Sequence, residues 1–229
     1  TDTGLKFKVI KSTYRDNEHL TANQLAYIES KKKNAIWWKV YGEGELGRLE
    51  GAVFTNWRFG EFDTTLQKLY GQDYGYSVDP TTLLKIAVDS KKKIIYADEC
   101  FYSQELKATS QIATANLSHA GQSLIVADSA EPRLISELRG IYKNNIVECL
   151  QESKKSVAAR LYRMLDYELV ITEGSANLEK ELNYYTWIDK KGKLVVDAFN
   201  HLIDPMGYAF DYFMQATSRK KTKIHVPRG

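Results

Sequence analysis

Several residue types and patterns are scarce in this 229-residue sequence, and each scarcity narrows what the protein can be. Cysteine occurs only twice, at Cys100 and Cys149, without the short spacing of a metal motif. We interpret both as reduced thiols, and a single disulfide between them is the less favoured alternative. Proline occurs four times in a chain that is 43% hydrophobic, which indicates a folded protein rather than a disordered one.

Long apolar runs and nucleotide-binding loops are also missing. No apolar stretch approaches the ~20 residues that a membrane-spanning helix needs, and no signal-peptide core is visible, so we expect no membrane association. The GxxxxGK[ST] loop of P-loop ATPases does not occur, so we expect no ATP-driven motor activity from this chain. The 32 Lys and Arg residues nearly balance the 29 Asp and Glu residues, which permits nucleic-acid contact only through local clusters.

The order of strand-like and helix-like stretches predicts an α/β fold. Residues 42–51 contain four glycines and no hydrophobic period, which makes them the best candidate boundary. Strand patterns then follow around residues 66–77, 81–89, 92–102, 124–130 and 168–172, and helical patterns separate the later ones. Three early strands followed by alternating helices and strands predict a mixed sheet flanked by helices. Because the sequence begins at Thr1 rather than Met, we interpret it as a piece of a longer protein.

A carboxylate at the end of an apolar strand is unfavourable unless it is paired, hydrogen-bonded or bound to a cation. The stretch LIVADSA, residues 124–130, has the pattern of a buried strand and yet ends on Asp128. Asp73 lies in an earlier strand, and Asp204 lies one helical turn after His201. We expect a closing helix over residues 197–214, which would place Asp197 on the same side as His201.

Each of these acids has a structural alternative as a turn residue, a helix cap or a solvated helix residue. Together, however, Asp73, Asp128 and Asp204 can converge at one edge of a mixed sheet, where they would repel one another. A hard divalent cation such as Mg²⁺ or Mn²⁺ would relieve that repulsion. Two such ions ~3.5–4 Å apart would suit a phosphodiester displacement. Zinc is not expected, because none of the four histidines forms a ligand pair at helical spacing.

Four motifs resemble, in order, the nuclease domain of phage terminase large subunits. They are LYGQDYGYSVDPTTLLKIAVD, IIYADECFY, LIVADSAEPRLISELR and DAFNHLIDPMGYA. The resemblance implies a ribonuclease H-like fold in which Asp73, Asp128 and Asp204 hold metal and His201 lies beside the metal site. It also implies a secondary role for Asp79 in the SVDP turn. Plain strand geometry puts Asp79 ~20 Å from Asp73, so this role requires the chain to fold back between residues 75 and 80.

The resemblance extends upstream to VYGEGELGRLEGAVFTNW, which looks like the junction between the packaging ATPase and the nuclease of that family. It implies that residues 1–50 are the end of the ATPase region with its linker. It further implies that residues 51–217 form the nuclease domain and that residues 218–229 form a basic C-terminal tail.

Two basic clusters are candidate DNA contacts. Lys190, Lys191 and Lys193 lie on an expected hairpin before the metal-bearing helix, where the family has a mobile hairpin beside the active site. Arg219, Lys220 and Lys221 belong to the basic tail, and C-terminal segments of the family engage DNA or the procapsid portal. For both clusters the alternative is an ordinary solvated turn or terminus.

The resemblance implies an endodeoxyribonuclease that cuts concatemeric viral DNA during genome packaging, with two divalent cations, Mg²⁺ or Mn²⁺, and little sequence specificity. The implied partners are double-stranded DNA, the packaging ATPase domain of the same full-length chain, the small terminase subunit and the procapsid portal, in the host-cell cytoplasm. One alternative is another ribonuclease H-like nuclease of the resolvase or transposase type. The other is a non-catalytic DNA-gripping or portal-docking module, which would need no divalent ion.

Overall fold

The chain forms two compact units, Thr1–Gly51 and Ala52–Gly229. The computed structural model describes residues 13–30, 32, 38, 43, 51–75, 78–189, 191 and 194–222. In the first unit it describes a short 3-10 helix, η1 (Tyr14–Asp16), and α1 (Ala22–Ser30). All of the predicted site residues belong to the second unit, which is described next.

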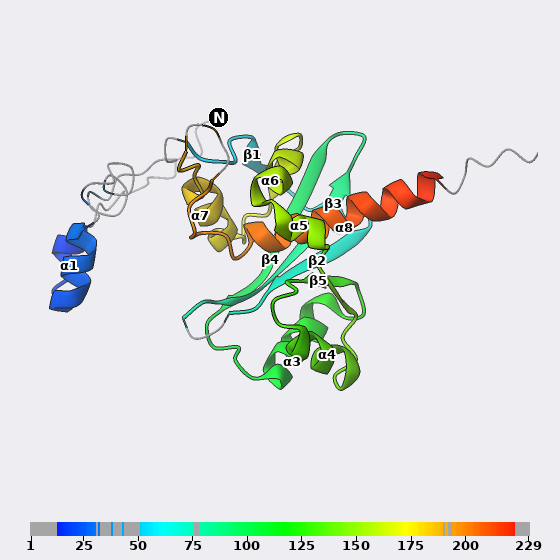
Figure 1. The fold of residues 1–229 in the computed structure, drawn as a ribbon, viewed down its shortest axis with the longest axis horizontal. Coiled ribbons are helices and arrows are strands. Elements are labelled where there is room, and N and C mark those ends of the chain that lie inside the picture. The colour runs from blue at the N-terminus through cyan, green and yellow to red at the C-terminus, as the bar shows by residue number, and fades with distance from the viewer. Residues whose placement is uncertain are drawn as a thin grey trace, which may run out of the picture. The chain divides into compact units, whose positions relative to one another are not determined.

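A seven-stranded mixed sheet with helices on both faces forms the second unit (Figure 1). The strands are β1 (Trp57–Phe59), β2 (Lys68–Asp73), β3 (Thr81–Asp89), β4 (Ile94–Ser103), β5 (Ile125–Ala127), β6 (Ile146–Glu148) and β7 (Glu168–Ile171). The helices are α3 (Thr109–Ala120), α4 (Pro132–Gly140), α5 (Gln151–Lys155), α6 (Val157–Leu165), α7 (Ala176–Tyr184) and α8 (Ile203–Thr222). The predicted mixed sheet flanked by helices is therefore confirmed.

The strand order is β1-β7-β4-β3-β2-β5-β6. The three early strands form an antiparallel meander, in which β3 pairs with both β2 and β4. The other pairings are parallel, including β2 with β5. This order places the ends of β2 and β5, where two of the predicted acids lie, next to each other on two interior strands of the sheet.

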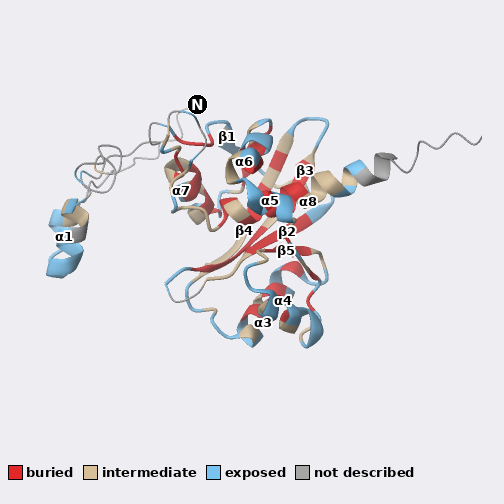
Figure 2. Cartoon of the chain, in the orientation of Figure 1, coloured by how far each residue is buried: buried red, intermediate tan, exposed pale blue. Residues whose placement is uncertain are grey.

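The sheet separates two hydrophobic cores, which explains why its central strands are apolar on both faces. In β2, Leu69 belongs to the core under α6, α7 and α8, and Tyr70 belongs to the core under α3 and α4. In β5, Val126 faces the first core, and Ile125 and Ala127 face the second. Figure 2 shows this burial as a red band through the sheet and the adjoining helix faces. Because side chains alternate between faces, Asp73 lies on the α8 side, two residues after Gly71.

The start of α8 packs directly on β2 at Gly71. A Cβ atom at Gly71 would lie 2.1 Å from the carbonyl oxygen of Pro205, so only glycine permits this approach. The contact fixes the beginning of α8 against the strand that ends on Asp73.

The predicted beginning of the closing helix was wrong by about one and a half turns. We expected a helix from residue 197, but α8 begins at Ile203. Residues 197–202 form bends and a turn, and Phe199 has a φ of +61°, outside the helical range. Asp197 therefore does not share a helix with His201.

Two expectations drawn from composition can be compared with the structure. Both cysteines are free, as interpreted from the sequence. Among the described residues, we find no helix with the length and apolar character needed to cross a membrane.

Candidate metal centre

Two of the three predicted acids come from neighbouring parallel strands. The last paired residues of β2 and β5 are Gln72 and Ala127. Asp73 and Asp128 occupy the next position on each strand, and the Asp128 amide donates a hydrogen bond of 3.0 Å to the Gln72 carbonyl. Because paired strands lie about 4.8 Å apart, the two carboxylates leave the sheet side by side on the same face.

The third acid, Asp204, arrives with the first turn of α8. Pro205, the next residue, lies against Gly71, and Gly71 and Asp73 share one face of β2. Asp204 is close enough for Asp73 and Asp128 to act on its charge, since both raise its pKa. The structure thus brings together Asp73, Asp128 and Asp204, although they are far apart in the sequence.

Each of the three carboxylates faces a basic side chain. Asp73 Oδ2 lies 3.3 Å from His201 Nδ1. The Lys154 ammonium donates to Asp128 Oδ1. The Arg160 guanidinium donates to Asp204 Oδ1. Lys154 and Arg160 come from α5 and α6, the helix pair that leads from β6 to β7.

The electrostatics of the site show incompletely relieved repulsion between acids. Burial, assisted by the neighbouring Asp73 and Asp128 carboxylates, raises the pKa of Asp204 to about 6, although Arg160 opposes the shift. The hydrogen bond to Asp73 raises the pKa of His201, against the opposing effect of burial. A cation that neutralises the acids would therefore be stabilised here.

The donor set fits a hard divalent cation, because it consists of clustered carboxylate oxygens. Asp204 Oδ2 makes only a long contact of 3.5 Å, with Asn200 Nδ2, and Asp128 Oδ2 makes a similar one with the Tyr208 hydroxyl. These oxygens are available as ligands. Among the described residues, no three Asp, Glu, His or Cys side chains are already arranged as a ligand set. Ion binding would require the carboxylate oxygens to reorient toward a shared point.

Asp79 lies near the site because the chain folds back after β2. The Gly75 amide donates to Thr81 Oγ1 at 3.2 Å, which closes the turn. Asp79 Oδ1 lies 3.9 Å from His201 Nε2, so His201 lies between Asp73 and Asp79. The fold-back that the role of Asp79 requires is therefore present, although the Asp79 side chain is 60% exposed.

Comparison with known proteins identifies the family. The model of the terminase RNase H-like domain family matches residues 73–212, more than half of the chain. The chain belongs to this family. Its metal-site candidates from Asp73 to Asp204 all lie within the matched range.

Two curated relatives of this terminase domain are large-subunit proteins. The terminase large subunit of Bacillus phage SPP1 is 30% identical over 228 residues, covering 89% of this chain and 52% of that protein. The PBSX phage terminase large subunit of Bacillus subtilis (strain 168) is 26% identical over 176 residues, covering 69% of this chain and 38% of that protein. The chain thus spans about half the length, or less, of these relatives.

Solved terminase structures share the ribonuclease H-like fold. The nuclease domain of the SPP1 large terminase, g2p, was crystallised with bound Mn; it is 26% identical, with a TM-score of 0.61. That match covers 74% of this chain and all of the SPP1 domain, at 100%. A large terminase from a thermophilic bacteriophage has a TM-score of 0.54 at 14% identity, covers 88% of this chain and 55% of that one, and supports the fold alone. The predicted ribonuclease H-like fold is confirmed.

Sequence reasoning missed two buried charged residues that support this terminase site, Arg160 and Glu181. Arg160 lies among Val157, Leu161 and Met164, on the stripe by which α6 packs against the core. Glu181 likewise lies between the buried Leu178 and Leu182 of α7. The sequence did contain a signal for both residues: each is a charged residue at a position where the helical period places apolar side chains. A charge buried at such a position needs a specific partner.

Glu181 holds the turn between His201 and α8. Its Oε2 accepts hydrogen bonds from the amides of Leu202 (2.8 Å) and Ile203 (3.1 Å), which open the helix. The Thr82 hydroxyl donates to the His201 carbonyl at 2.6 Å. Burial raises the pKa of Glu181 to about 7 despite the two amides. Strand β3 and helix α7 therefore clamp the segment that carries His201 and Asp204.

The predicted DNA-contact lysines are only partly described. Lys190 and Lys193 lie outside the described residues, and Lys191 is exposed. The predicted hairpin around them has a bridge between Trp187 and Val195. Arg219, Lys220 and Lys221 lie within the bounds of α8, but their side chains are outside the described part of the chain. A DNA contact by either cluster stays a prediction.

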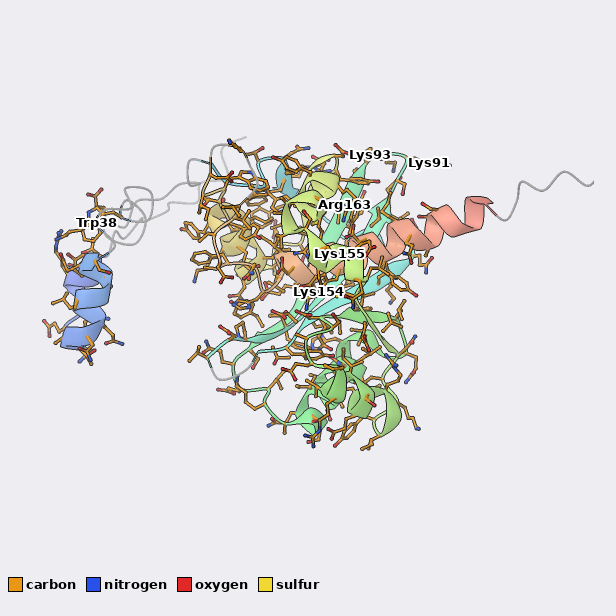
Figure 3. The ribbon with its side chains drawn as sticks, in the orientation of Figure 1. Trp38, Lys91, Lys93, Lys154, Lys155 and Arg163 are labelled. Atoms are coloured by element: carbon orange, nitrogen blue, oxygen red, sulfur yellow. The ribbon has the colours of Figure 1, made fainter. Side chains whose placement is uncertain are left out.

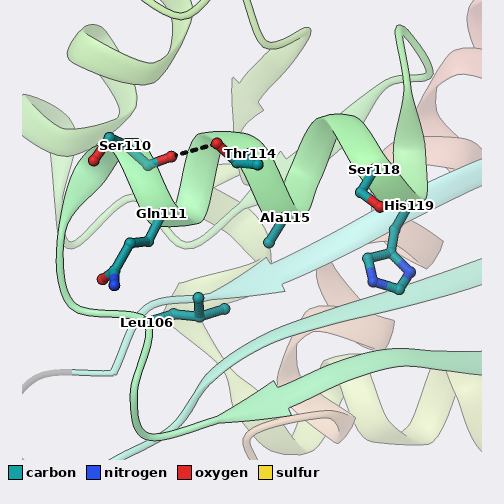
Figure 4. Close-up of a pocket in the computed structure, with 7 residues that line it drawn as sticks. All are labelled: Leu106, Ser110, Gln111, Thr114, Ala115, Ser118 and His119. Atoms are coloured by element: carbon teal, nitrogen blue, oxygen red, sulfur yellow. Dashed lines mark hydrogen bonds between the residues drawn. The ribbon is translucent and has the colours of Figure 1, made fainter.

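A separate open cavity of about 530 Å³ lies along α3 (Figure 4). It is lined by Leu106 and by six residues of α3, namely Ser110, Gln111, Thr114, Ala115, Ser118 and His119. Within the described part of the chain, none of the three site aspartates lines this cavity. The acid cluster at the ends of β2 and β5, rather than this cavity, is therefore the candidate metal centre.

Proposed function

We propose that the chain is a divalent-metal-dependent DNA endonuclease that cuts concatemeric viral DNA during genome packaging. The observation that carries this proposal is the meeting of Asp73, Asp128 and Asp204 on one face of the sheet, in a terminase ribonuclease H-like domain. The SPP1 nuclease domain crystallised with bound Mn supports a metal role for the matching region.

The residues that would hold two Mg²⁺ or Mn²⁺ ions are Asp73, Asp128 and Asp204, with Asp79 as a secondary candidate. Bound divalent ions would supply Lewis-acid stabilisation of the phosphate and a hydroxide nucleophile at neutral pH. Asp73 and Asp128 present their oxygens from the ends of two paired interior strands, and Arg160 holds Asp204 in place. Preorganised ligands of this kind reduce the cost of assembling the reacting geometry.

His201 is placed to move a proton at the edge of this cluster. Its Nδ1 faces Asp73 at 3.3 Å and its Nε2 faces Asp79 at 3.9 Å. Hydrogen bonding to Asp73 raises the pKa of His201, which favours the protonated ring more than in a free histidine. We assign His201 the role of orienting Asp73 and protonating the departing oxygen.

The wider setting is part of the same proposal. The substrate is double-stranded DNA, and its backbone would be contacted by Lys190, Lys191 and Lys193 and by the tail cations Arg219, Lys220 and Lys221. The remaining partners would be the packaging ATPase domain of a full-length chain, the small terminase subunit and the procapsid portal, in the host-cell cytoplasm. The curated large-subunit relatives are about twice as long or longer, which leaves room for the proposed ATPase region outside the matched part.

The proposal is tested by incubating the chain with supercoiled plasmid in Mn²⁺, Mg²⁺ or EDTA. We expect nicking and linearisation with either ion and none in EDTA. Asp128→Ala should abolish cleavage without unfolding the protein, because it removes a shared ligand and relieves charge repulsion. Asp166→Ala, at an exposed aspartate after α6, is the matched control and should cut normally. A folded Asp128→Ala protein with wild-type cutting rates would remove Asp128 from the site and contradict the proposed set of metal ligands.

A further inference from the structure

The three basic partners of the acid cluster differ in how firmly they are held. The side chain of Arg160 is 1% exposed, that of His201 is 24% exposed and that of Lys154 is 34% exposed. Arg160 and His201 also make contacts beyond their acids. These differences indicate which base can leave its carboxylate and which cannot.

Arg160 is a fixed part of the interface between α6 and α8. Its guanidinium donates to the Ser153 carbonyl at 2.7 Å and lies 4.7 Å from the centre of the Tyr208 ring. A Cβ atom at Gly207 would lie 2.5 Å from Arg160 Cδ, so the side chain fills the space that glycine leaves. Withdrawal of Arg160 from Asp204 would open a cavity and leave the guanidinium charge without its carboxylate partner. Arg160 therefore stays with Asp204.

Lys154 is held much more weakly. Its ammonium donates a hydrogen bond to Asp128 Oδ1, and its side chain is the most exposed of the three bases. It projects from α5, a helix of only five residues, and Figure 3 shows it beside Lys155 on that helix. Its long, flexible stem lets the ammonium leave Asp128 without moving the helix.

The oxygens of Asp128 indicate what Lys154 competes with. Oδ1 accepts from both the Ala130 amide (2.9 Å) and Lys154, and Oδ2 has only the 3.5 Å contact with the Tyr208 hydroxyl. An ammonium beside Asp128 neutralises the charge that a divalent ion would use, and the two cations repel each other at contact distance. Both therefore cannot occupy Asp128 favourably.

We propose that Lys154 is a built-in competitor of the divalent ion at Asp128. This inference rests on the proposed metal-dependent function. In the metal-free protein Lys154 neutralises Asp128, and ion binding requires its ammonium to move away. Lys154 thereby raises the ion concentration at which the site fills, while Arg160 keeps Asp204 positioned in both states.

The test is a calorimetric titration of Mn²⁺ into the DNA-free chain, which needs no catalytic readout. Lys154→Gln should bind Mn²⁺ about 3- to 10-fold more tightly than wild type, because the ion no longer breaks an ion pair. Lys154→Arg keeps the competing charge and should stay near the wild-type affinity. Lys155→Gln is the matched control: it removes the same charge from the next residue, whose partner is Glu152 rather than a site acid, and should leave the affinity unchanged.

The outcomes separate this inference from the proposed function. Wild-type Mn²⁺ binding with equal or weaker binding by Lys154→Gln would overturn the competition and leave the metal site standing. Equal tightening in Lys154→Gln and Lys155→Gln would assign the effect to net charge and also overturn it. Absence of Mn²⁺ binding by the folded wild-type chain would overturn the proposed function and the competition together.

Discussion

Replacing Glu181 with leucine should loosen the start of α8 and with it the position of Asp204. Glu181 is 2% exposed, and its Oε2 accepts from the amides of Leu202 and Ile203, two residues that are fully buried at 0% exposure. Glu181→Leu has nearly the same volume but offers no acceptor. Both amides would then be buried without partners.

The magnitude follows from those two amides. A buried donor left without a partner costs about 1–3 kcal/mol, so two of them should lower the free energy of unfolding by about 2–6 kcal/mol. Glu181→Gln keeps an acceptor oxygen and should lose much less. The comparison is cleanest at pH 5, where wild-type Glu181 is protonated, since burial raises its pKa to about 7.

The same pKa gives the glutamine variant a pH signature. The pKa of Glu181 is raised from 4.5 to about 7 on folding, so its contribution is fully present below pH 4.5 and is lost as pH rises through 7. The difference of roughly 2.5 pKa units corresponds to about 3 kcal/mol. The stability of wild type relative to Glu181→Gln should therefore fall by up to about 3 kcal/mol between pH 5 and pH 8.

Urea unfolding at both pH values measures these differences, and hydrogen exchange at Leu202 and Ile203 localises them. Glu181→Leu should also bind Mn²⁺ more weakly, because Asp204 directly follows the released amides. A leucine variant as stable as wild type, with both amides still protected from exchange, would refute the idea that Glu181 caps α8.

Three further predictions concern the site. His201→Ala should slow plasmid cleavage by ~10–100-fold without abolishing it. Complete loss of cleavage, as expected for Asp128→Ala, would give His201 a direct role in the reaction. Unchanged cleavage would show that the role of His201 is structural. Mn²⁺ affinity, measured by calorimetry, should fall as the pH drops below about 6, because Asp204, whose pKa is raised to about 6, becomes protonated and can no longer bind the ion as a carboxylate. An Mn²⁺ affinity that stays constant from pH 7 to pH 5 would contradict this prediction. Gly71→Ala should destabilise the fold in urea by several kcal/mol, since its Cβ would lie 2.1 Å from the Pro205 carbonyl oxygen; wild-type stability would show that α8 can move away.

Long apolar patterns made much of the sheet predictable. The strand around Asp73, the two strands that follow it and the strand before Asp128 all stood out as apolar runs, and β2 to β5 confirm them. Strand β6 escaped detection because Ile146–Glu148 contains only two apolar residues before a charged one, whereas β5, which is equally short, lies in the longer run LIVA at residues 124–127. Its place in the sheet depends on pairing with β5, a tertiary contact.

The site was predictable only as far as the motifs reached. The resemblance identified Asp73, Asp128, Asp204 and His201, and the structure brings these four residues together. Their basic partners could not be assigned from local pattern. Lys154 stands next to Lys155 in the sequence, and only the packing of α5 decides which of the two reaches Asp128.

The residue at which α8 begins could not be predicted from the sequence for a related reason. The residues from 197 onward have an amphipathic pattern, which favours a longer helix. The observed beginning at Ile203 is imposed by the Glu181 carboxylate, which comes from another helix and takes the amides that a longer helix would use internally.

The order of the three acids along the chain has a consequence for synthesis. Asp73 and Asp128 are in place once β2 and β5 pair, but Asp204 enters with α8, the last helix of the described chain. A ribosome-bound or truncated product that lacks α8 holds two acids, no third, and an Arg160 without its carboxylate partner. If the proposed function holds, such a product should not cut DNA until α8 docks against β2 and supplies the third proposed metal ligand.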